Sequence, residues 1–164
     1  RFVTLIYPGR PIDPFITDIT GIADKMVRDK PIESDIISEF LEFLNDLPLV
    51  AHNISFDKSF LDALCERFSK PKKNNSLFDT LQLSRTFLFF HPVHDLGSIS
   101  EYFGLSSAGP HRAEKDTENC GIIFQRLIKE AASYPLETIT KLLELIRSYN
   151  VPNMQLYIYL ANEF

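Results

Sequence analysis

The sequence predicts a layered α/β body followed by a helical tail. Short runs rich in β-branched and aromatic residues alternate with longer segments whose apolar residues recur at helical spacing, and this alternation favours strands packed against helices. After residue 134 the strand-like runs stop and helical patterns continue. We therefore expect a body over residues 1–133 and a helical C-terminal extension over residues 134–164.

The composition suits one globular domain. Of 164 residues, 45% are apolar and 24% are charged, which excludes a disordered chain. The formal net charge of -5 excludes a protein that binds nucleic acid through bulk positive charge, so an anionic ligand would have to be held locally. No apolar run approaches the roughly 18 to 20 residues that span a bilayer, and we expect a cytoplasmic protein without membrane contact. Cys65 and Cys120 lack metal-ligand spacing, so we expect two buried thiols.

The first third of the chain contains two predicted strands. Residues 1–8 (RFVTLIYP) have strand composition and end at a Pro-Gly turn. A helix is predicted over residues 34–47 from its apolar spacing. A short buried strand is predicted over residues 49–51, and it ends at the polar pair His52 and Asn53, which indicates a functional loop.

Helices dominate the rest of the chain. One begins near Ser55, and its expected core-facing stripe consists of Phe56, Phe60, Leu61, Leu64 and Phe68. Leu77 and Phe78 favour a short strand, and Asp79 is placed to cap the helix that follows it. A short helix carries Ile99 and ends at Gly104. The later helices are expected at residues 113–132, 135–149 and 153–163.

Two of these helices each point one carboxylate toward the predicted core. At about 100° per residue, Asp57 falls on the core-facing side of its helix, and Asp116 lies at the edge of the apolar stripe of its own helix. An ionised carboxylate facing an apolar interior is costly unless it is paired, hydrogen-bonded or bound to a metal. The alternative is that both are ordinary first-turn acids, which favour the helix dipole and reach water.

Three histidines are candidates for proton transfer or metal binding. His111 lies five positions before Asp116, in the loop that leads into its helix, so the imidazole can reach over the same place and accept a proton at neutral pH. A solvated loop side chain is the alternative for His111. His91 and His94, spaced i and i+3, offer a competing zinc site, although the third ligand that zinc would need is not evident beside them.

Two segments resemble motifs of a known enzyme family. AHNISFDKSFL (residues 51–61) and HRAEKDT (residues 111–117) resemble the second and third motifs of the DnaQ-like, DEDDh-type 3′–5′ exonucleases. FDTLQLSRTF, DLGSISEYFGL and YPGRPIDPFITDITGI also resemble this family, so the similarity covers about residues 1–130. Within the family, the resemblance points to the polymerase III epsilon subunit and, through the tail YPLETITKLLELIRSYN, to exonuclease domains linked to DinG-type helicases.

The resemblance implies a ribonuclease H-like fold, with a mixed sheet flanked by helices, and a site with two Mg²⁺ or Mn²⁺ ions held by four carboxylates. By motif position, Asp57 and Asp116 would be two of the metal ligands, and His111 would be the general base. The substrate-binding residues that it implies are His52, Asn53, Phe56, Gly21 and Ile22.

The first family motif, an Asp-x-Glu on the central strand, is not present in these residues. By the family pattern it should lie upstream of residues 1–8. We therefore expect a body that lacks its N-terminal strands and, with them, half of the metal ligands, and in which residues 1–8 form an edge strand.

The expected function is that of a metal-dependent 3′–5′ exonuclease. It would hydrolyse phosphodiester bonds at the 3′ ends of single-stranded or frayed DNA, as in proofreading or repair. Two alternatives remain open. One is a catalytically lapsed module that binds nucleic-acid ends or docks to a DNA polymerase or helicase, and the other is an enzyme that trims RNA in the manner of oligoribonuclease or RNase T.

Overall fold

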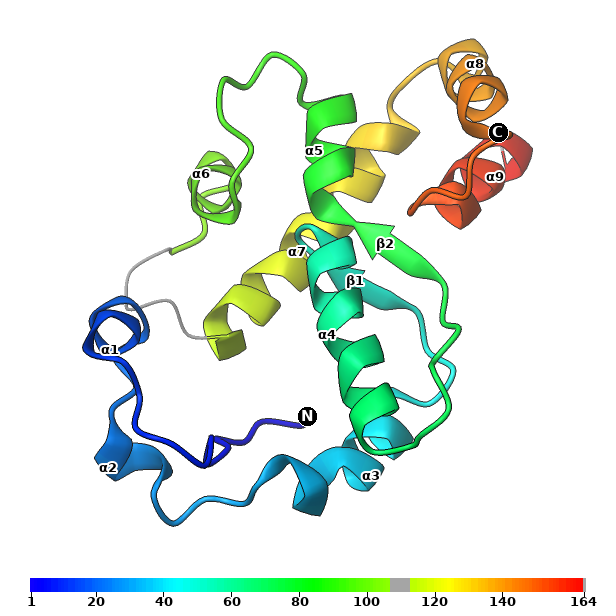
Figure 1. The fold of residues 1–164 in the computed structure, drawn as a ribbon. Helices are drawn as coiled ribbons and strands as arrows, with labels where there is room; N and C mark the ends of the chain where they lie inside the picture. The colour runs from blue at the N-terminus through cyan, green and yellow to red at the C-terminus, as the bar shows by residue number, and fades with distance from the viewer. Residues whose placement is uncertain (107–112, 164) are drawn as a thin grey trace.

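The computed structural model describes residues 1–106 and 113–163. Two parallel strands lie at its centre, β1 (Leu49–Ala51) and β2 (Leu77–Asp79), with Leu49 opposite Leu77 and Ala51 opposite Asp79 (Figure 1). Helix α4 (Ile54–Arg67) connects them, since parallel strands need a long crossover. The predicted strands at residues 49–51 and 77–78 are thus present.

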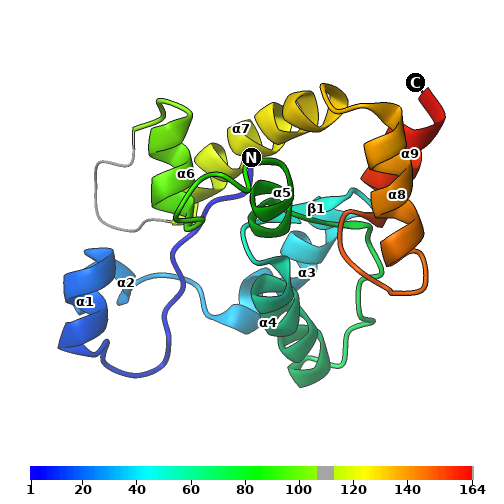
Figure 2. The same ribbon diagram turned by 90° about the horizontal axis from the view of Figure 1, so that it is seen from above.

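Helices surround this small sheet. Figure 2 shows α7 (Ala113–Ala132) on one side of the strands and α3 (Glu33–Leu44) and α4 on the other. The sequence pattern predicts helices after the second strand, and the structure has α5 to α9 there. The remaining helices are α1 (Pro14–Thr20), α2 (Asp24–Val27), α5 (Thr80–Phe87), α6 (Leu96–Tyr102), α8 (Leu136–Ile146) and α9 (Met154–Glu163).

The strand expected over residues 1–8 is not formed. These residues are all described and have no regular secondary structure. The Tyr7 N–H donates a hydrogen bond to the Pro31 carbonyl oxygen at 2.9 Å, and the Phe2 ring packs on the rings of Phe40 and Phe43. Strand composition alone does not make a strand, because the segment also needs a neighbour to pair with. Within the described residues β1 and β2 pair only with each other.

The larger of two apolar clusters is built by α5, α6, α7 and the C-terminal helices. The expected extension is part of it, because Ile139 of α8 and Tyr157 of α9 are buried against the same residues. The Phe87 ring, for example, lies near the ring of Tyr157. The fully buried residues of this cluster include Leu83, Phe87, Leu88, Ile99, Ile123, Leu127 and Ala131.

The smaller cluster joins α3 to α4 through Ile37, Leu41, Leu61 and Cys65. Beside it lies an apolar cavity of about 620 Å³, between residues 1–6, α3 and the start of α7. Cys65 and Cys120 are both buried free thiols, as predicted. Within the described ranges, no helix is both long and apolar enough to cross a membrane.

Candidate functional site

A second cavity, of about 680 Å³, opens where β1 ends and where α4 and α7 begin. The carboxyl end of a parallel strand is a common position for a ligand site. Asp57 from α4 and Asp116 from α7 both line this cavity, together with His52 and Phe56. The structure therefore brings together four of the residues that the sequence indicates.

Asn53 sets the start of α4. It adopts the left-handed conformation, with φ 72° and ψ 58°, at the N-cap position, which asparagine tolerates better than most residues. Its backbone N–H donates to the Asp79 carboxylate at 3.0 Å, and the Ser55 hydroxyl donates to its side-chain oxygen, also at 3.0 Å. These bonds fix the first turn of the helix, which carries Asp57.

Asp57 faces the cavity and remains accessible to solvent, so its carboxylate is not enclosed in the packed core. Partial burial raises the pKa of this carboxyl above its ordinary value, and the nearby Asp79 charge raises it further, while a backbone hydrogen bond at Asp57 acts in the opposite direction. A cation bound beside Asp57 would relieve the unfavourable charge.

Asp116 approaches the cavity from the first turn of α7, where it is half-buried. One turn further along, the buried thiol of Cys120 lies 3.5 Å from the Thr80 hydroxyl. Burial raises the pKa of Cys120, so the thiol stays protonated at neutral pH. Cys120 thus lines the cavity as an uncharged thiol.

His52 ties three segments together at the cavity wall. Its Nε2 lies 2.8 Å from the His94 carbonyl oxygen, so Nε2 carries the proton and donates, and Nδ1 accepts from the Thr80 hydroxyl at 3.0 Å. Burial lowers the pKa of His52, which favours this neutral ring. Both ring nitrogens are therefore engaged in joining β1 to α5 and to the loop before α6.

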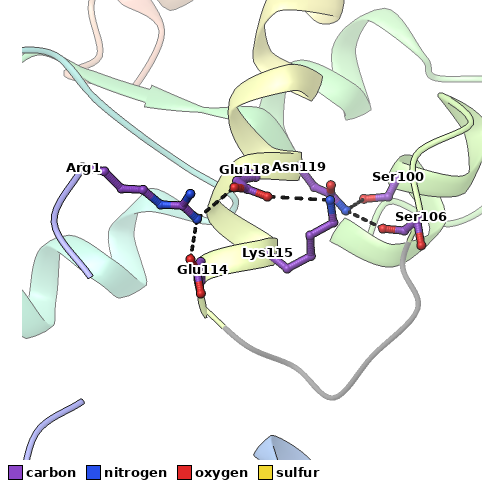
Figure 3. Close-up of polar contacts among 7 residues, drawn as sticks. All are labelled: Arg1, Ser100, Ser106, Glu114, Lys115, Glu118 and Asn119. Carbon is purple, nitrogen blue, oxygen red and sulfur yellow. Dashed lines mark hydrogen bonds and ion pairs between the residues drawn. The ribbon is translucent and has the colours of Figure 1, made fainter. Parts of the chain in front are cut away.

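The first turns of α7 are held from two sides. Figure 3 shows Arg1 contacting Glu114 and Glu118, the second at 2.9 Å. On the other side, the buried Asn119 amide donates to the Ser100 hydroxyl at 3.3 Å and to the Ser106 carbonyl at 3.1 Å. These contacts fix the part of α7 from which Asp116 reaches the cavity.

Among the described residues, three expected site residues, Asn53, Gly21 and Ile22, are not part of the lining of this cavity. Gly21 and Ile22 follow α1, where Gly21 has φ 69° and caps the helix, and neither is among the residues that line the cavity. Figure 1 shows α1 well separated from the strands. His111 lies outside the described residues.

The expected core-facing orientation of Phe56 and Phe60 is wrong. The two rings contact each other in a tilted arrangement, with centroids 4.9 Å apart, and the two residues are 60% and 64% exposed. Helix α4 packs instead through Ile54, Leu61 and Cys65, whose spacing defines a face turned away from both rings. Phe56 stands at the rim of the cavity, with Phe60 one turn beyond it.

The RNase T exonuclease family model matches residues 1–124, about three quarters of the chain. The chain belongs to this exonuclease family. The DnaQ-like assignment made from the two motifs is therefore confirmed, together with the ribonuclease H-like, mixed α/β fold class. The family match covers all of α4, with Asp57, and the first part of α7, with Asp116.

Relatives of this exonuclease chain include very long proteins. It is 39% identical over 133 residues to the PolC-type DNA polymerase III of Streptococcus pneumoniae, covering 80% of the chain and 9% of that protein. The PolC-type protein of Caldanaerobacter subterraneus is 30% identical over 158 residues, or 96% and 11%. The chain thus spans about a tenth of these relatives.

A solved structure shares the fold. Exonuclease X in complex with 5′ overhanging duplex DNA aligns with a TM-score of 0.57 and 25% identity, over 79% of this chain and 74% of that one. The likeness extends over most of both chains, so it covers the exonuclease body and is not confined to a local motif.

Two carboxylates at the cavity are of the chemical type that binds hard divalent cations. Asp57 and Asp116 offer the carboxylate oxygens that Mg²⁺ and Mn²⁺ prefer. No group of three His, Cys, Asp or Glu side chains among the described residues is arranged to hold an ion, and the pair His91 and His94 gains no third ligand there. Two carboxylates fit the chemistry of such a site without completing it.

Proposed function

We propose that this exonuclease-family chain acts as a metal-dependent 3′–5′ exonuclease on single-stranded or frayed DNA ends. The observation that carries the proposal is that Asp57 and Asp116, from two separate helices, both line one cavity beside the end of β1. The likeness to PolC-type DNA polymerase III supports work beside a DNA polymerase. Our proposal is that this work is proofreading or repair and takes place in the cytoplasm. Residues 1–133 would carry this activity.

Each site residue has a proposed role. Asp57 and Asp116 would hold Mg²⁺ or Mn²⁺, which supplies charge neutralisation at the phosphate and activation of water. His111 would accept a proton as the general base. The exposed Phe56 ring offers a stacking surface to a terminal base. His52 would shape the wall, while Asn53, Gly21 and Ile22 would complete the contacts to the terminal nucleotide.

The experiment is a shortening assay on a 5′-labelled single-stranded DNA oligomer with Mg²⁺ or Mn²⁺, using the full chain as it is encoded. Shortening from the 3′ end is expected, with loss of activity in Asp116→Asn. Glu66→Gln, an exposed change on α4 far along the helix from Asp57, is the matched control and should retain activity. Failure of the unaltered chain to shorten DNA with either metal would refute the proposal.

A lapsed binding module is the second candidate, because the described residues supply two carboxylates and not a full set. It predicts oligomer binding without shortening under the same conditions. The remaining alternative is an enzyme that trims short RNA. Matched RNA and DNA oligomers of several lengths in the same assay distinguish it, because it predicts faster shortening of short RNA than of DNA.

A further inference from the structure

Asn153 completes the outer edge of β2. This residue is 1% exposed and has φ 69°, just before α9. Its backbone N–H donates to the Leu77 carbonyl at 2.9 Å, its side-chain oxygen accepts from the Asp79 N–H at 2.8 Å, and its side-chain amide donates to the Asp79 carbonyl at 3.2 Å. One residue thus satisfies three backbone groups of the strand, as a neighbouring strand would.

The same strand residue reaches the candidate site. The Asp79 carboxylate is buried and accepts from the Asn53 N–H at 3.0 Å and from the Leu81 N–H at 2.9 Å. Asn53 opens α4, and Asp57 follows one turn later. A continuous series of hydrogen bonds therefore runs from the C-terminal helices to the helix that carries Asp57. Figure 1 shows the loop before α9 returning to β2.

We propose that Asn153 is a positioning residue for Asp57, acting through Asp79 and Asn53. The inference rests on the proposed exonuclease function. The C-terminal helices would thereby set the geometry of the catalytic cavity as well as adding to the core.

The chemistry of the contact requires asparagine. The Asp79 backbone presents a donor and an acceptor to the same side chain, so the partner must accept and donate at once, as an amide does. The positive φ excludes most residues with a larger side chain. Aspartate would keep the acceptor and lose the donor, placing an oxygen against the Asp79 carbonyl.

The decisive variant is Asn153→Gly. Glycine accepts the positive φ and keeps the backbone bond to Leu77, so the substitution removes only the two side-chain bonds to Asp79. We expect kcat on a DNA oligomer to fall about tenfold, with KM nearly unchanged, and more metal to be needed for half-maximal activity. Asn153→Asp should behave similarly.

The matched control is Leu160→Val, which thins a buried contact of α9 and leaves the hydrogen bonds of Asn153 to β2 in place. It should lower the melting temperature and leave kcat unchanged while the protein is folded. Equal loss of kcat in both variants at equal stability would overturn the inference, as would full kcat in Asn153→Gly.

Amide hydrogen exchange tests the same proposal without activity. The Asn53 N–H should exchange faster in Asn153→Gly than in Leu160→Val, because its acceptor on Asp79 is no longer fixed. Unchanged exchange at Asn53 would refute the positioning role. An unaltered chain that shows no nuclease activity would instead refute the proposed function, so the two failures are distinguishable.

Discussion

The two apolar clusters differ sharply in how completely they are filled. The cluster of α5 to α9 contains Phe87, Ile123 and Leu127, all with almost no exposed surface. The cluster of α3 and α4 has four buried residues and adjoins cavities of about 620 and 680 Å³. The first is a closed core, and the second is an open one that faces the candidate site.

The candidate site lies between these two regions. Asp116 stands at the start of α7, whose later turns are buried in the closed core, whereas Asp57 stands on α4, which packs in the open one. Stability and activity should therefore respond to different substitutions. Changes in the closed core should unfold the chain, and changes at the cavity should alter the chemistry while the fold persists.

The largest expected effect is in the closed core. Phe87→Ala removes a ring that is 1% exposed, and such a deletion costs about 3–5 kcal/mol of unfolding free energy. Phe89→Ala is the control, since Phe89 lies two residues away, is 70% exposed, and should change stability by less than about 0.5 kcal/mol. Chemical denaturation measures both, and similar losses would show that the closed core extends over Phe89.

The next effect is on activity at the open side. Asp57→Asn should lower kcat/KM by about two to three orders of magnitude, because it removes a charge proposed to hold the metal. Its melting temperature at pH 7 should stay equal or rise, because the raised pKa of Asp57 means that ionisation works against the folded state as pH increases through that value.

Parallel nuclease assays and thermal unfolding check both halves of this prediction. Glu66→Gln again serves as the control on the same helix. Full activity in Asp57→Asn would show that this carboxylate is not needed for catalysis. A large drop in melting temperature would show that Asp57 stabilises the fold.

The two family motifs indicated Asp57 and Asp116, and both residues line one cavity. Helical spacing predicted that Asp57 faces the core, which is wrong, because Asp57 is exposed. It also failed for Phe60, since a run of apolar residues on α4 can be divided into more than one stripe, and the packing of Ile54 and Cys65 decided which stripe is buried. Local sequence spacing shows where the apolar residues of a helix lie, but tertiary contacts decide which of them are buried.

Long-range pairing was outside the reach of sequence pattern. Residues 1–8 have strand composition, yet no described strand lies beside them. Asn153 lies in a loop far along the chain from Leu77 and Asp79, and its three bonds to them follow no local spacing rule. Asp79 itself was expected only as a helix cap, which it is, while its bond to Asn53 emerges from the fold.

A smaller effect is expected from the exposed aromatic pair. Phe60→Ala should leave stability nearly unchanged, because the ring is 64% exposed, but it should weaken binding of a single-stranded oligomer. Stacking of one base on an aromatic ring contributes about 1–3 kcal/mol, which corresponds to a rise in Kd of roughly 5- to 150-fold. Fluorescence anisotropy with a labelled oligomer measures this, and Leu145→Ala, an exposed change on α8, should leave Kd unchanged.

The smallest effect concerns His52, which joins the two regions through Thr80 and the His94 carbonyl. Burial lowers its pKa in the folded chain, so above the ordinary histidine value of about 6.5 both folded and unfolded states hold it neutral and its stabilising contribution is complete. As pH falls below that value, the unfolded chain takes up the proton first, and stability decreases until the lower folded-state pKa is passed.

His52→Gln should therefore flatten the dependence of unfolding free energy on pH between about 7.5 and 5.5, by at most about one proton. Denaturant titrations across that range measure the slope. An unchanged slope in the variant would mean that the bonds of His52 hold the two regions together equally well in the charged state.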